Sequence, residues 1–212
     1  MKNHFNLLFF CLVIVLVVFS SCTSEKGEVT YDFTTVFEIS EGTETASYEQ
    51  IIEFYNQLAK NYTSVAIYEM DKTDSGKPLH LVTFNPNRSF EYEFSEDKDK
   101  NILLINNGIH PGESDGIDAS MMLIRDLAQQ KIDAPKNTII AVIPVYNVGG
   151  ALNRNSTTRT NQNGPKEYGF RGNSRNYDLN RDFIKSDTKN ARAFADIFRT
   201  IKPNLFIDNH VS

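Results

Sequence analysis

The spacing of hydrophobic residues along this 212-residue chain predicts both helices and strands. Ser47 and Gln50 form a capping-box pattern, and the apolar residues that follow up to Tyr62 recur at helical spacing, which predicts an amphipathic helix. The same spacing predicts helices at about 117–129 and 191–201. Short apolar runs bounded by turn residues predict strands at 65–68, 79–84, 102–105, 138–142 and 205–207.

Strands that alternate with helices indicate an α/β sheet, with parallel or mixed pairing and helices on its faces. Residues 31–39 alternate loosely between apolar and polar positions, as in an edge strand. The long polar stretch at 153–176 is rich in Asn, Arg, Thr and Gly. A connection of that length in a compact domain is usually either functional or disordered, and we interpret this one as a binding loop.

The first residues are typical of a targeting signal. Lys2 precedes thirteen uninterrupted apolar residues at 7–19, which are too few for a bilayer span of roughly 20 but suit a signal-peptide core of about 7–15. Phe19-Ser20-Ser21-Cys22 resembles a bacterial lipobox, in which cleavage leaves a lipid-modified cysteine as the new first residue. Phe stands where Leu is commonest, so ordinary secretion is the alternative.

These features predict three segments. Residues 1–21 form a lipoprotein signal peptide, 22–40 form a tether with a possible edge strand, and 41–212 form the folded domain. The mature chain is then expected to be exported and anchored in a bacterial envelope membrane through a lipid on Cys22, facing the periplasm or the surface.

Composition narrows the possible partners and the source of stability. The only cysteine besides Cys22 is Cys11, inside the signal, so the mature chain has no pair for an intramolecular disulfide. The formal net charge is −5, and removing Lys2 with the signal makes it −6. This acidity, without a basic run, argues against nucleic acid as the partner. The 40% hydrophobic content is enough for one sizeable core.

Two of the four histidines directly follow predicted strands. His110 and Glu113 lie in the polar loop after 102–105, and an imidazole and a carboxylate this close in sequence can bind one cation. His210 follows the run at 205–207, so both histidines are expected just past the carboxyl end of a strand, where open α/β sheets place their ligands. A loop histidine beside a solvated glutamate is the alternative for the His110–Glu113 pattern alone.

A further segment, from Arg171 to Phe183, reads Arg-Gly-Asn-Ser-Arg-Asn-Tyr-Asp-Leu-Asn-Arg-Asp-Phe. It resembles the Arg-x-Asn…Asp-Leu-Asn-Arg-x-Phe signature of zinc carboxypeptidases of the carboxypeptidase A type. In that family a His-x-x-Glu pair, the Asn-Arg motif and a strand-end histidine occur in the order seen here. The resemblance covers about 47–212 and implies a mixed, largely parallel sheet flanked by helices on both faces, incomplete at the C-terminus.

The resemblance implies a metal centre. His110, Glu113 and His210 would bind Zn²⁺, which activates a water molecule and polarises the scissile carbonyl. Asp178 would accept the second ring N–H of His110 and so orient that ligand. The alternative for Asp178 is a helix or turn cap.

The resemblance also implies a substrate site. Asn180 and Arg181 would bind the terminal carboxylate of the substrate, because a guanidinium matches a carboxylate through two hydrogen bonds. Arg171 would stabilise the oxyanion of the tetrahedral intermediate, a role for which Arg159 and Arg175 compete. A surface ion pair is the alternative for Arg181.

The chain departs from the family pattern in three places. The usual Asn-Pro-Asp-Gly loop is replaced by Asn147-Val148-Gly149-Gly150, and Asp182 stands where Asn is common. Family members also carry a general-base glutamate and a substrate-capping tyrosine well beyond the third zinc ligand, whereas this sequence stops at Ser212. We therefore expect an N-terminal fragment that lacks the general base and the specificity pocket.

The leading hypothesis is a zinc metallocarboxypeptidase that removes the C-terminal residue of peptides with a zinc-activated water. A zinc amidase or deacylase acting on acyl-amino acids or γ-linked cell-wall peptides is one alternative. The other is a non-catalytic envelope binding module that keeps the fold. In both enzyme hypotheses the substrate carries a free carboxylate, which Asn180 and Arg181 favour.

Overall fold

The computed structural model describes residues 31–87 and 100–211. The chain divides into two compact units, Met1–Asp32 and Phe33–Ser212, and every element named below belongs to the second. The predicted signal peptide 1–21, the predicted lipidation site Cys22 and the tether up to residue 30 lie outside the described residues. Within the described ranges, no helix is both long and apolar enough to cross a membrane.

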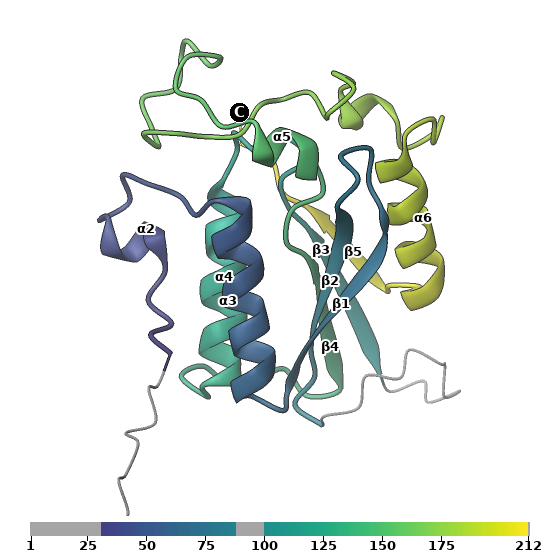
Figure 1. The fold of residues 1–212 in the computed structure, drawn as a ribbon. Coiled ribbons are helices and arrows are strands. Elements are labelled where there is room, and N and C mark those ends of the chain that lie inside the picture. Colours follow the sequence, from purple (N-terminus) through teal and green to yellow (C-terminus); the bar gives the residue numbers. More distant parts are fainter. Residues whose placement is uncertain (1–30, 88–99, 212) are drawn as a thin grey trace, which may run out of the picture. The chain divides into compact units, whose positions relative to one another are not determined.

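Among the described residues, five strands form one mixed sheet in the order β1-β2-β4-β3-β5 (Figure 1). β2 is antiparallel to both β1 and β4, whereas β3 is parallel to both β4 and β5. The predicted mixed α/β class is thus confirmed, with parallel pairing in the half of the sheet that contains β3. The strands are Val65–Lys72 (β1), Pro78–Phe84 (β2), Asn101–Asn106 (β3), Thr138–Ile143 (β4) and Leu205–Asp208 (β5).

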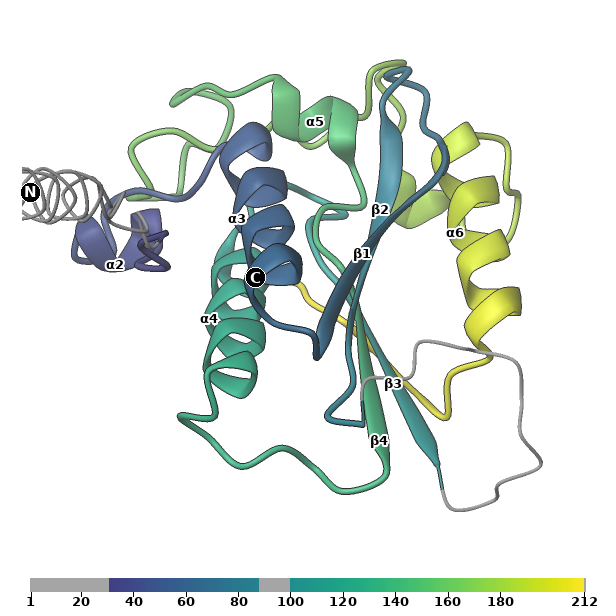
Figure 2. The ribbon, with the colours of Figure 1, turned by 60° about the horizontal axis from the view of Figure 1, so that its bottom comes forward.

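Helices cover both faces of the sheet, as predicted (Figures 1 and 2). α3 (Tyr48–Asn61) and α4 (Asp115–Ala128) lie on one face, and α6 (Lys189–Ile201) lies on the other. α3 begins at the predicted capping box, in which the Ser47 hydroxyl accepts from Gln50 N and the Gln50 side chain accepts from Ser47 N. Because helices pack on both sides, β2 is buried along nearly its whole length.

α6 is fixed against the strand that leads to His210. Its buried face includes Phe194, whose ring meets that of Phe206 on β5 edge-on at 5.7 Å between centroids. Phe194 also packs against Phe183, 5.2 Å away, and Tyr146, 5.5 Å away. This aromatic cluster packs α6 against β5, the strand that leads to His210.

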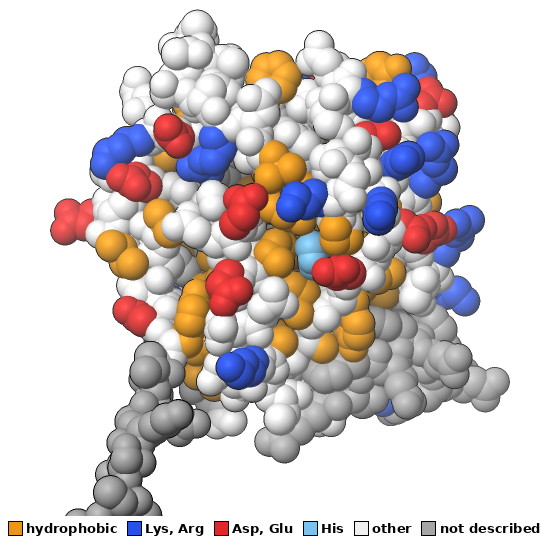
Figure 3. Space-filling view, in the orientation of Figure 1, with side chains coloured by type: hydrophobic (Ala, Val, Ile, Leu, Met, Phe, Trp, Pro, Cys, Tyr) orange, Lys and Arg blue, Asp and Glu red, His pale blue; other side chains and the backbone are white. Residues whose placement is uncertain are grey.

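Figure 3 shows the surface of the face seen in Figure 1. Acidic and basic side chains are interspersed over its described part, with hydrophobic side chains between them. On this face, therefore, the charges form no single-sign patch.

The predicted edge strand at 31–39 is wrong. The structure has a short helix there, α2 (Val36–Ile39), with a capping box in which Thr35 and Glu38 bond each other's backbone N–H. Those local bonds compete with strand pairing, and Phe33 packs its ring 5.8 Å from that of Phe54 on α3. The second compact unit begins at Phe33 and so includes this helix.

The stretch predicted as a loop after β4 contains the short helix α5 (Val148–Leu152), capped by the Asn147 side chain, which accepts from Gly150 N at 2.8 Å. Its two glycines allow the segment after residue 169 to pack closely. A Cβ on Gly149 would lie 2.5 Å from Ser174 N, and one on Gly150 would overlap the Phe170 carbonyl oxygen. This contact leaves no room for a side chain at positions 149 and 150.

Candidate metal centre

The loop after β3 places His110 and Glu113 at the end of a buried strand. Gly108 adopts φ +64 in the turn, and a Cβ there would lie 3.1 Å from the Ile117 side chain, so glycine suits both the conformation and the space. Glu113 N donates to the His110 carbonyl at 2.8 Å, which turns both side chains the same way. His110 and Glu113 are 2% and 7% exposed, so this loop is part of the interior.

β5 brings His210 to the same edge of the sheet. β5 runs parallel to β3 with Asp208 opposite Asn106, so the two strand ends coincide. Asn209 N then donates to Asn106 O at 3.0 Å, and the Asn209 side chain donates to Asn107 Oδ1 at 2.7 Å. The ring centroids of His110 and His210 lie 5.2 Å apart.

Among the described residues, His110, Glu113 and His210 form a triad whose ligand atoms all lie within 4.8 Å of one another. Nδ1 of His110 is 3.1 Å from Glu113 Oε1, and Nδ1 of His210 is 3.1 Å from Glu113 Oε2. Two imidazoles and a carboxylate form a ligand set that Zn²⁺ binds readily. The structure thus brings together the three residues that the sequence predicted.

Each histidine has a carboxylate behind it. Asp178 Oδ1 lies 3.0 Å from His110 Nε2, as predicted, and Asp208 Oδ2 lies 3.0 Å from His210 Nε2. These carboxylates hold a proton on each Nε2 and leave the Nδ1 lone pairs facing the Glu113 oxygens. Acceptor groups that face each other at 3.1 Å need a cation between them, so the triad fits a metal ion.

Asp208 was missed by the sequence analysis. The available signal was its position two residues before His210 at the end of a predicted strand. Successive strand residues point to opposite faces, so residues two apart share a face. An Asp-x-His pair at a strand end can therefore place a carboxylate beside the imidazole.

Glu113 is oriented by a guanidinium and a backbone amide. Arg159 Nη2 donates to Glu113 Oε1 at 2.6 Å, and Val211 N donates to Oε2 at 3.1 Å. Burial acts to raise the pKa of Glu113, but the hydrogen bond from Arg159 and the other donors outweigh burial and hold the pKa below its usual range. Arg159, which the sequence left as a competitor for the oxyanion role, thus pairs with a metal-ligand candidate.

Arg171 lies on the His110 side of the triad. Its Nε and Nη2 donate to Asp178 Oδ2 at 3.1 and 2.9 Å, and its Nη1 is 3.4 Å from His110 Nδ1. Burial acts to raise the pKa of Asp178, but the bonds from His110 and Arg171 keep it below its usual range. Arg175 instead donates to Tyr177 OH at 3.2 Å, with its guanidinium 4.7 Å from the ring centroid. Of the three arginines considered for the oxyanion role, Arg171 is therefore the one whose guanidinium lies beside His110.

Asn180 and Arg181 lie in the short 3-10 helix η1 (Leu179–Arg181), directly after Asp178. Asp178 Oδ1 accepts from Asn180 N at 3.0 Å, so one carboxylate fixes both His110 and the start of this helix. The side chain of Arg181 is exposed and donates to Asn180 O at 3.0 Å. No hydrogen bond or ion pair between described residues joins the Asn180 or Arg181 side chain to the triad, and their carboxylate-binding role remains a prediction.

A residue far from the metal centre supports the loop that carries Arg171 and Asp178. Asp74, in the turn between β1 and β2, accepts from Asn173 Nδ2 at 3.1 Å. The Asn173 Oδ1 atom accepts from Tyr177 N at 3.0 Å, which closes the loop between Arg171 and Asp178. The β1–β2 turn therefore helps to hold the loop that carries Arg171 and Asp178.

Asp182 has a structural role. Its carboxylate accepts from Asp187 N, Thr188 N and the Thr188 hydroxyl at 2.9, 2.9 and 2.6 Å. Burial acts to raise the pKa of Asp182, but these bonds outweigh it and lower the pKa. Thr188 in turn caps α6, so Asp182 orders the start of the helix that precedes β5.

The predicted binding loop at 153–176 is ordered by contacts to other loops. Arg154 donates to the carbonyl oxygens of Thr45 and Ala46, both at 3.1 Å. Asn155 and Tyr168 pair as an isolated β-bridge that closes the loop on itself. Gln162 Nε2 donates to the Gly112 carbonyl at 2.9 Å, so the loop also touches the segment between His110 and Glu113.

The chain is similar in sequence to known proteins named as probable carboxypeptidases. The chain is 26% identical over 176 residues to "Probable carboxypeptidase 2" of Trichophyton verrucosum, with 81% of the chain and 31% of that protein covered. The chain thus spans about a third of the length of such relatives.

Solved structures share the fold. A metallo-carboxypeptidase from Burkholderia cenocepacia matches at TM-score 0.60 with 20% identity, over 79% of this chain and 41% of that one. One from Pseudomonas aeruginosa, in complex with (2-guanidinoethylmercapto)succinic acid, matches at 0.56 with 17% identity, over 79% and 40%. The model of the zinc carboxypeptidase family matches residues 44–207, a range that contains His110, Glu113 and Asp178. The chain belongs to the zinc carboxypeptidase family.

Proposed function

We propose that the protein is a zinc metallocarboxypeptidase that hydrolyses the C-terminal peptide bond of peptides. The convergence of His110, Glu113 and His210 within 4.8 Å carries this proposal. The carboxylates of Asp178 and Asp208 behind the two histidines support it, because metal-binding imidazoles are commonly held in this way. Family membership supports the reaction type.

The chain's own groups have distinct tasks in this reaction. His110, Glu113 and His210 would hold the zinc ion, which when bound supplies a Lewis acid and activates water. Asp178 and Asp208 keep the Nε2 protons in place, which leaves the Nδ1 atoms available to the zinc ion that the two histidines would hold. Arg159 keeps Glu113 ionised and ready to bind a cation.

The substrate would be held by its free carboxylate. Asn180 and Arg181 lie two and three residues after Asp178, and the exposed guanidinium of Arg181 can bind a carboxylate through two hydrogen bonds. Arg171, beside His110, is placed to stabilise negative charge on the carbonyl oxygen. The succinic acid compound bound by the P. aeruginosa protein of the same fold also carries carboxylates.

We also propose that the protein is exported and anchored by a lipid on Cys22. The support is the sequence itself, in which Lys2, thirteen apolar residues and Ser20-Ser21 precede that cysteine. Metabolic labelling with a palmitate analogue tests this proposal. Label on the natural protein that is absent from Cys22→Ala would support it, and equal labelling of both would contradict it.

The enzymatic proposal is tested by metal analysis together with an assay of amino-acid release. The purified full-length protein, which contains this chain, is expected to bind one zinc ion per molecule and to release C-terminal residues from a mixed peptide library. His110→Ala should lose both zinc and release. Arg181→Ala should keep zinc but lose most of the release, because it removes the anchor for the substrate carboxylate.

Other outcomes would overturn parts of the proposal. Zinc without release from peptides, but with hydrolysis of acyl-amino acids, would replace the carboxypeptidase with an amidase or deacylase. Zinc without any hydrolysis would favour a binding module. Absence of zinc would refute the metal centre.

A further inference from the structure

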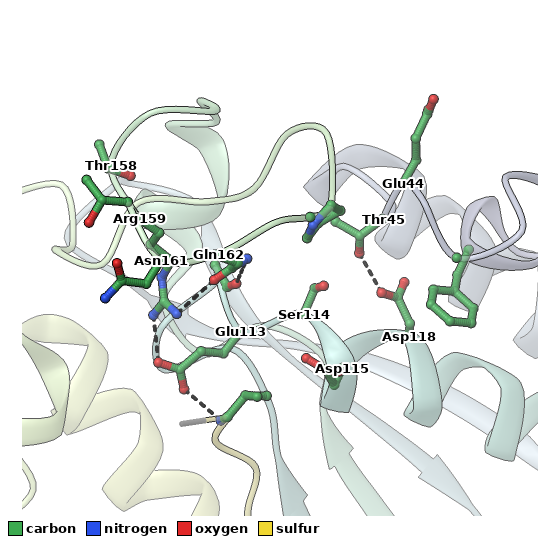
Figure 4. Close-up of a pocket in the computed structure, with 17 residues that line it drawn as sticks. Glu44, Thr45, Glu113, Ser114, Asp115, Asp118, Thr158, Arg159, Asn161 and Gln162 are labelled. Carbon is green, nitrogen blue, oxygen red and sulfur yellow. Dashed lines mark hydrogen bonds and ion pairs between the residues drawn. The ribbon is translucent and has the colours of Figure 1, made fainter.

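A cavity of about 630 Å³ adjoins the triad at Glu113 (Figure 4). Its walls are the start of α4, the segment before α3 and the loop at 158–165. The volume is within the range of about 300–1,000 Å³ typical of ligand sites. The cavity meets the triad at Glu113, whereas Arg171 and Asp178 contact the triad at His110.

Two carboxylates on α4, Asp115 and Asp118, line this cavity, and neither forms an ion pair with a described cationic side chain. Asp118 is 3% exposed, and its Oδ2 accepts from the Thr45 hydroxyl at 2.7 Å, as Figure 4 shows. Its Oδ1 is buried and has no hydrogen-bond partner among the described residues. Asp115 lies one helical turn earlier and is exposed at the same wall. A buried carboxylate oxygen without a donor is costly, which points to a ligand that supplies one.

The other charges at the cavity are already paired. Glu113 binds Arg159, the one cationic side chain among the described residues that line the cavity. Glu44 binds Lys166. The two aspartates therefore leave the cavity with net negative charge, and Phe37 and Pro165 add apolar surface to its wall. Carboxylates beside apolar surface suit the aliphatic stem and charged end of a basic side chain.

We infer that this cavity binds a basic side chain of the substrate, on the N-terminal side of the scissile bond. The inference rests on the proposed carboxypeptidase function. An exopeptidase of this kind leaves only one residue beyond the scissile bond, and the groups proposed to hold that residue lie on the His110 side of the triad. The remaining peptide then extends past Glu113 into the cavity, where an ammonium or guanidinium can donate to Asp118 and Asp115.

Matched substrates test the inference. Acetylated peptides that differ only in Lys, Gln or Glu at each of the three positions before the C-terminal residue are compared by the rate of C-terminal residue release. At one position we expect kcat/KM for Lys to exceed that for Glu by about tenfold or more, because each charge-assisted hydrogen bond is worth roughly a factor of ten. Arg in place of Lys should behave in the same way.

Variants connect that preference to the cavity. Asp118→Asn and Asp115→Asn should each reduce the Lys-over-Glu ratio at that position while leaving release from the Gln peptide within about twofold. Asp115 is exposed, so its substitution keeps the test valid if Asp118→Asn perturbs folding. Asp133→Asn, which removes an exposed carboxylate that does not line the cavity, should leave the ratio unchanged.

The outcomes separate the inference from the proposed function. Release at equal rates from the Lys, Gln and Glu peptides would overturn the inference and leave the carboxypeptidase intact. A Lys preference that survives both aspartate substitutions would place the basic-residue site elsewhere and also overturn the inference. No release from any peptide would refute the proposed function and the inference with it.

Discussion

Replacing Asp118 by Asn is expected to stabilise the folded protein at neutral pH. Burial raises the pKa of the Asp118 carboxyl from its usual 3.8 to about 6, against the hydrogen bond from the Thr45 hydroxyl, and the charge of Asp115 raises it further. The raised pKa means that the folded protein holds the ionised carboxylate less favourably than the unfolded chain does. An amide removes the charge and can keep the hydrogen bond from Thr45.

The size and sign of the effect follow from the two pKa values. Below about pH 4 the carboxyl is protonated in both states, so its ionisation has no effect on stability. Between about pH 4 and 6 the unfolded chain gives up its proton first, and the folded state loses stability. Above about pH 6 the loss is complete. One pKa unit corresponds to about 1.36 kcal/mol, so the full loss is ~3 kcal/mol.

Urea unfolding of both proteins from pH 4 to pH 8 measures this directly. The free energy of unfolding of Asp118→Asn minus that of the natural protein should rise by ~3 kcal/mol between pH 4 and pH 7 and then stay level. Asp133→Asn, which alters an exposed loop carboxylate, should show no such rise. A difference that is constant across the pH range, or that falls as pH rises, would refute the argument.

Asp118→Asn also tests whether the buried carboxylate is needed for substrate selectivity. A carboxylate that reduces the stability of the folded state is kept when it serves binding, and removing it commonly trades function for stability. Asp118→Asn should therefore be both more stable at pH 7 and less selective for basic substrates. Greater stability with unchanged selectivity would leave the buried carboxylate without a functional reason.

Three further predictions concern other parts of the structure. Asp178→Ala and Asp208→Ala should each weaken zinc binding by about 10–100-fold in chelator competition, because each frees the Nε2 of a ligand histidine. Asp74→Ala should lower the free energy of unfolding, measured in urea, by ~1–2 kcal/mol, because it removes the acceptor for Asn173. The double variant Asp74→Asn, Asn173→Asp, which swaps the two side chains, should recover most of that loss. The ion pair with Arg125 lowers the pKa of Glu38 to about 2. Glu38→Gln should therefore lower the free energy of unfolding by ~1 kcal/mol at pH 7, and the difference between variant and natural protein should disappear as the pH falls from 4.5 to 2.

Hydrophobic periodicity predicted the regular elements well because each is amphipathic or buried. α3 and α6 begin at side-chain caps, and β3 and β4 are apolar runs that the helices cover. The prediction failed at 31–39, where loose alternation suggested a strand. Thr35 and Glu38 already had the spacing of a capping box, so a local hydrogen-bond signal was present and outweighed a weak period.

The candidate site was predictable only where it depended on strand ends. His110 and His210 could be identified because each follows an apolar run, and Asp178 could be assigned through the family motif. The pairing of Arg159 with Glu113 could not be predicted, since 46 residues separate them in a polar stretch without periodicity. Asp118 also resembled an ordinary polar residue near a helix start, and its burial depends on how the segment before α3 packs.

The sheet order explains why the metal-ligand candidates meet. β3 lies between β4 and β5 and is parallel to both, so the chain leaves β3 and β5 at the same edge. Periodicity alone does not specify which strands are neighbours. The register of Asn106 opposite Asp208 sets His210 against Glu113, and a slip by one residue would turn Asp208 to the other face. The contacts of Asn209 with Asn106 and Asn107 oppose that slip, so this asparagine maintains the candidate metal site although it is not one of the three candidate ligands.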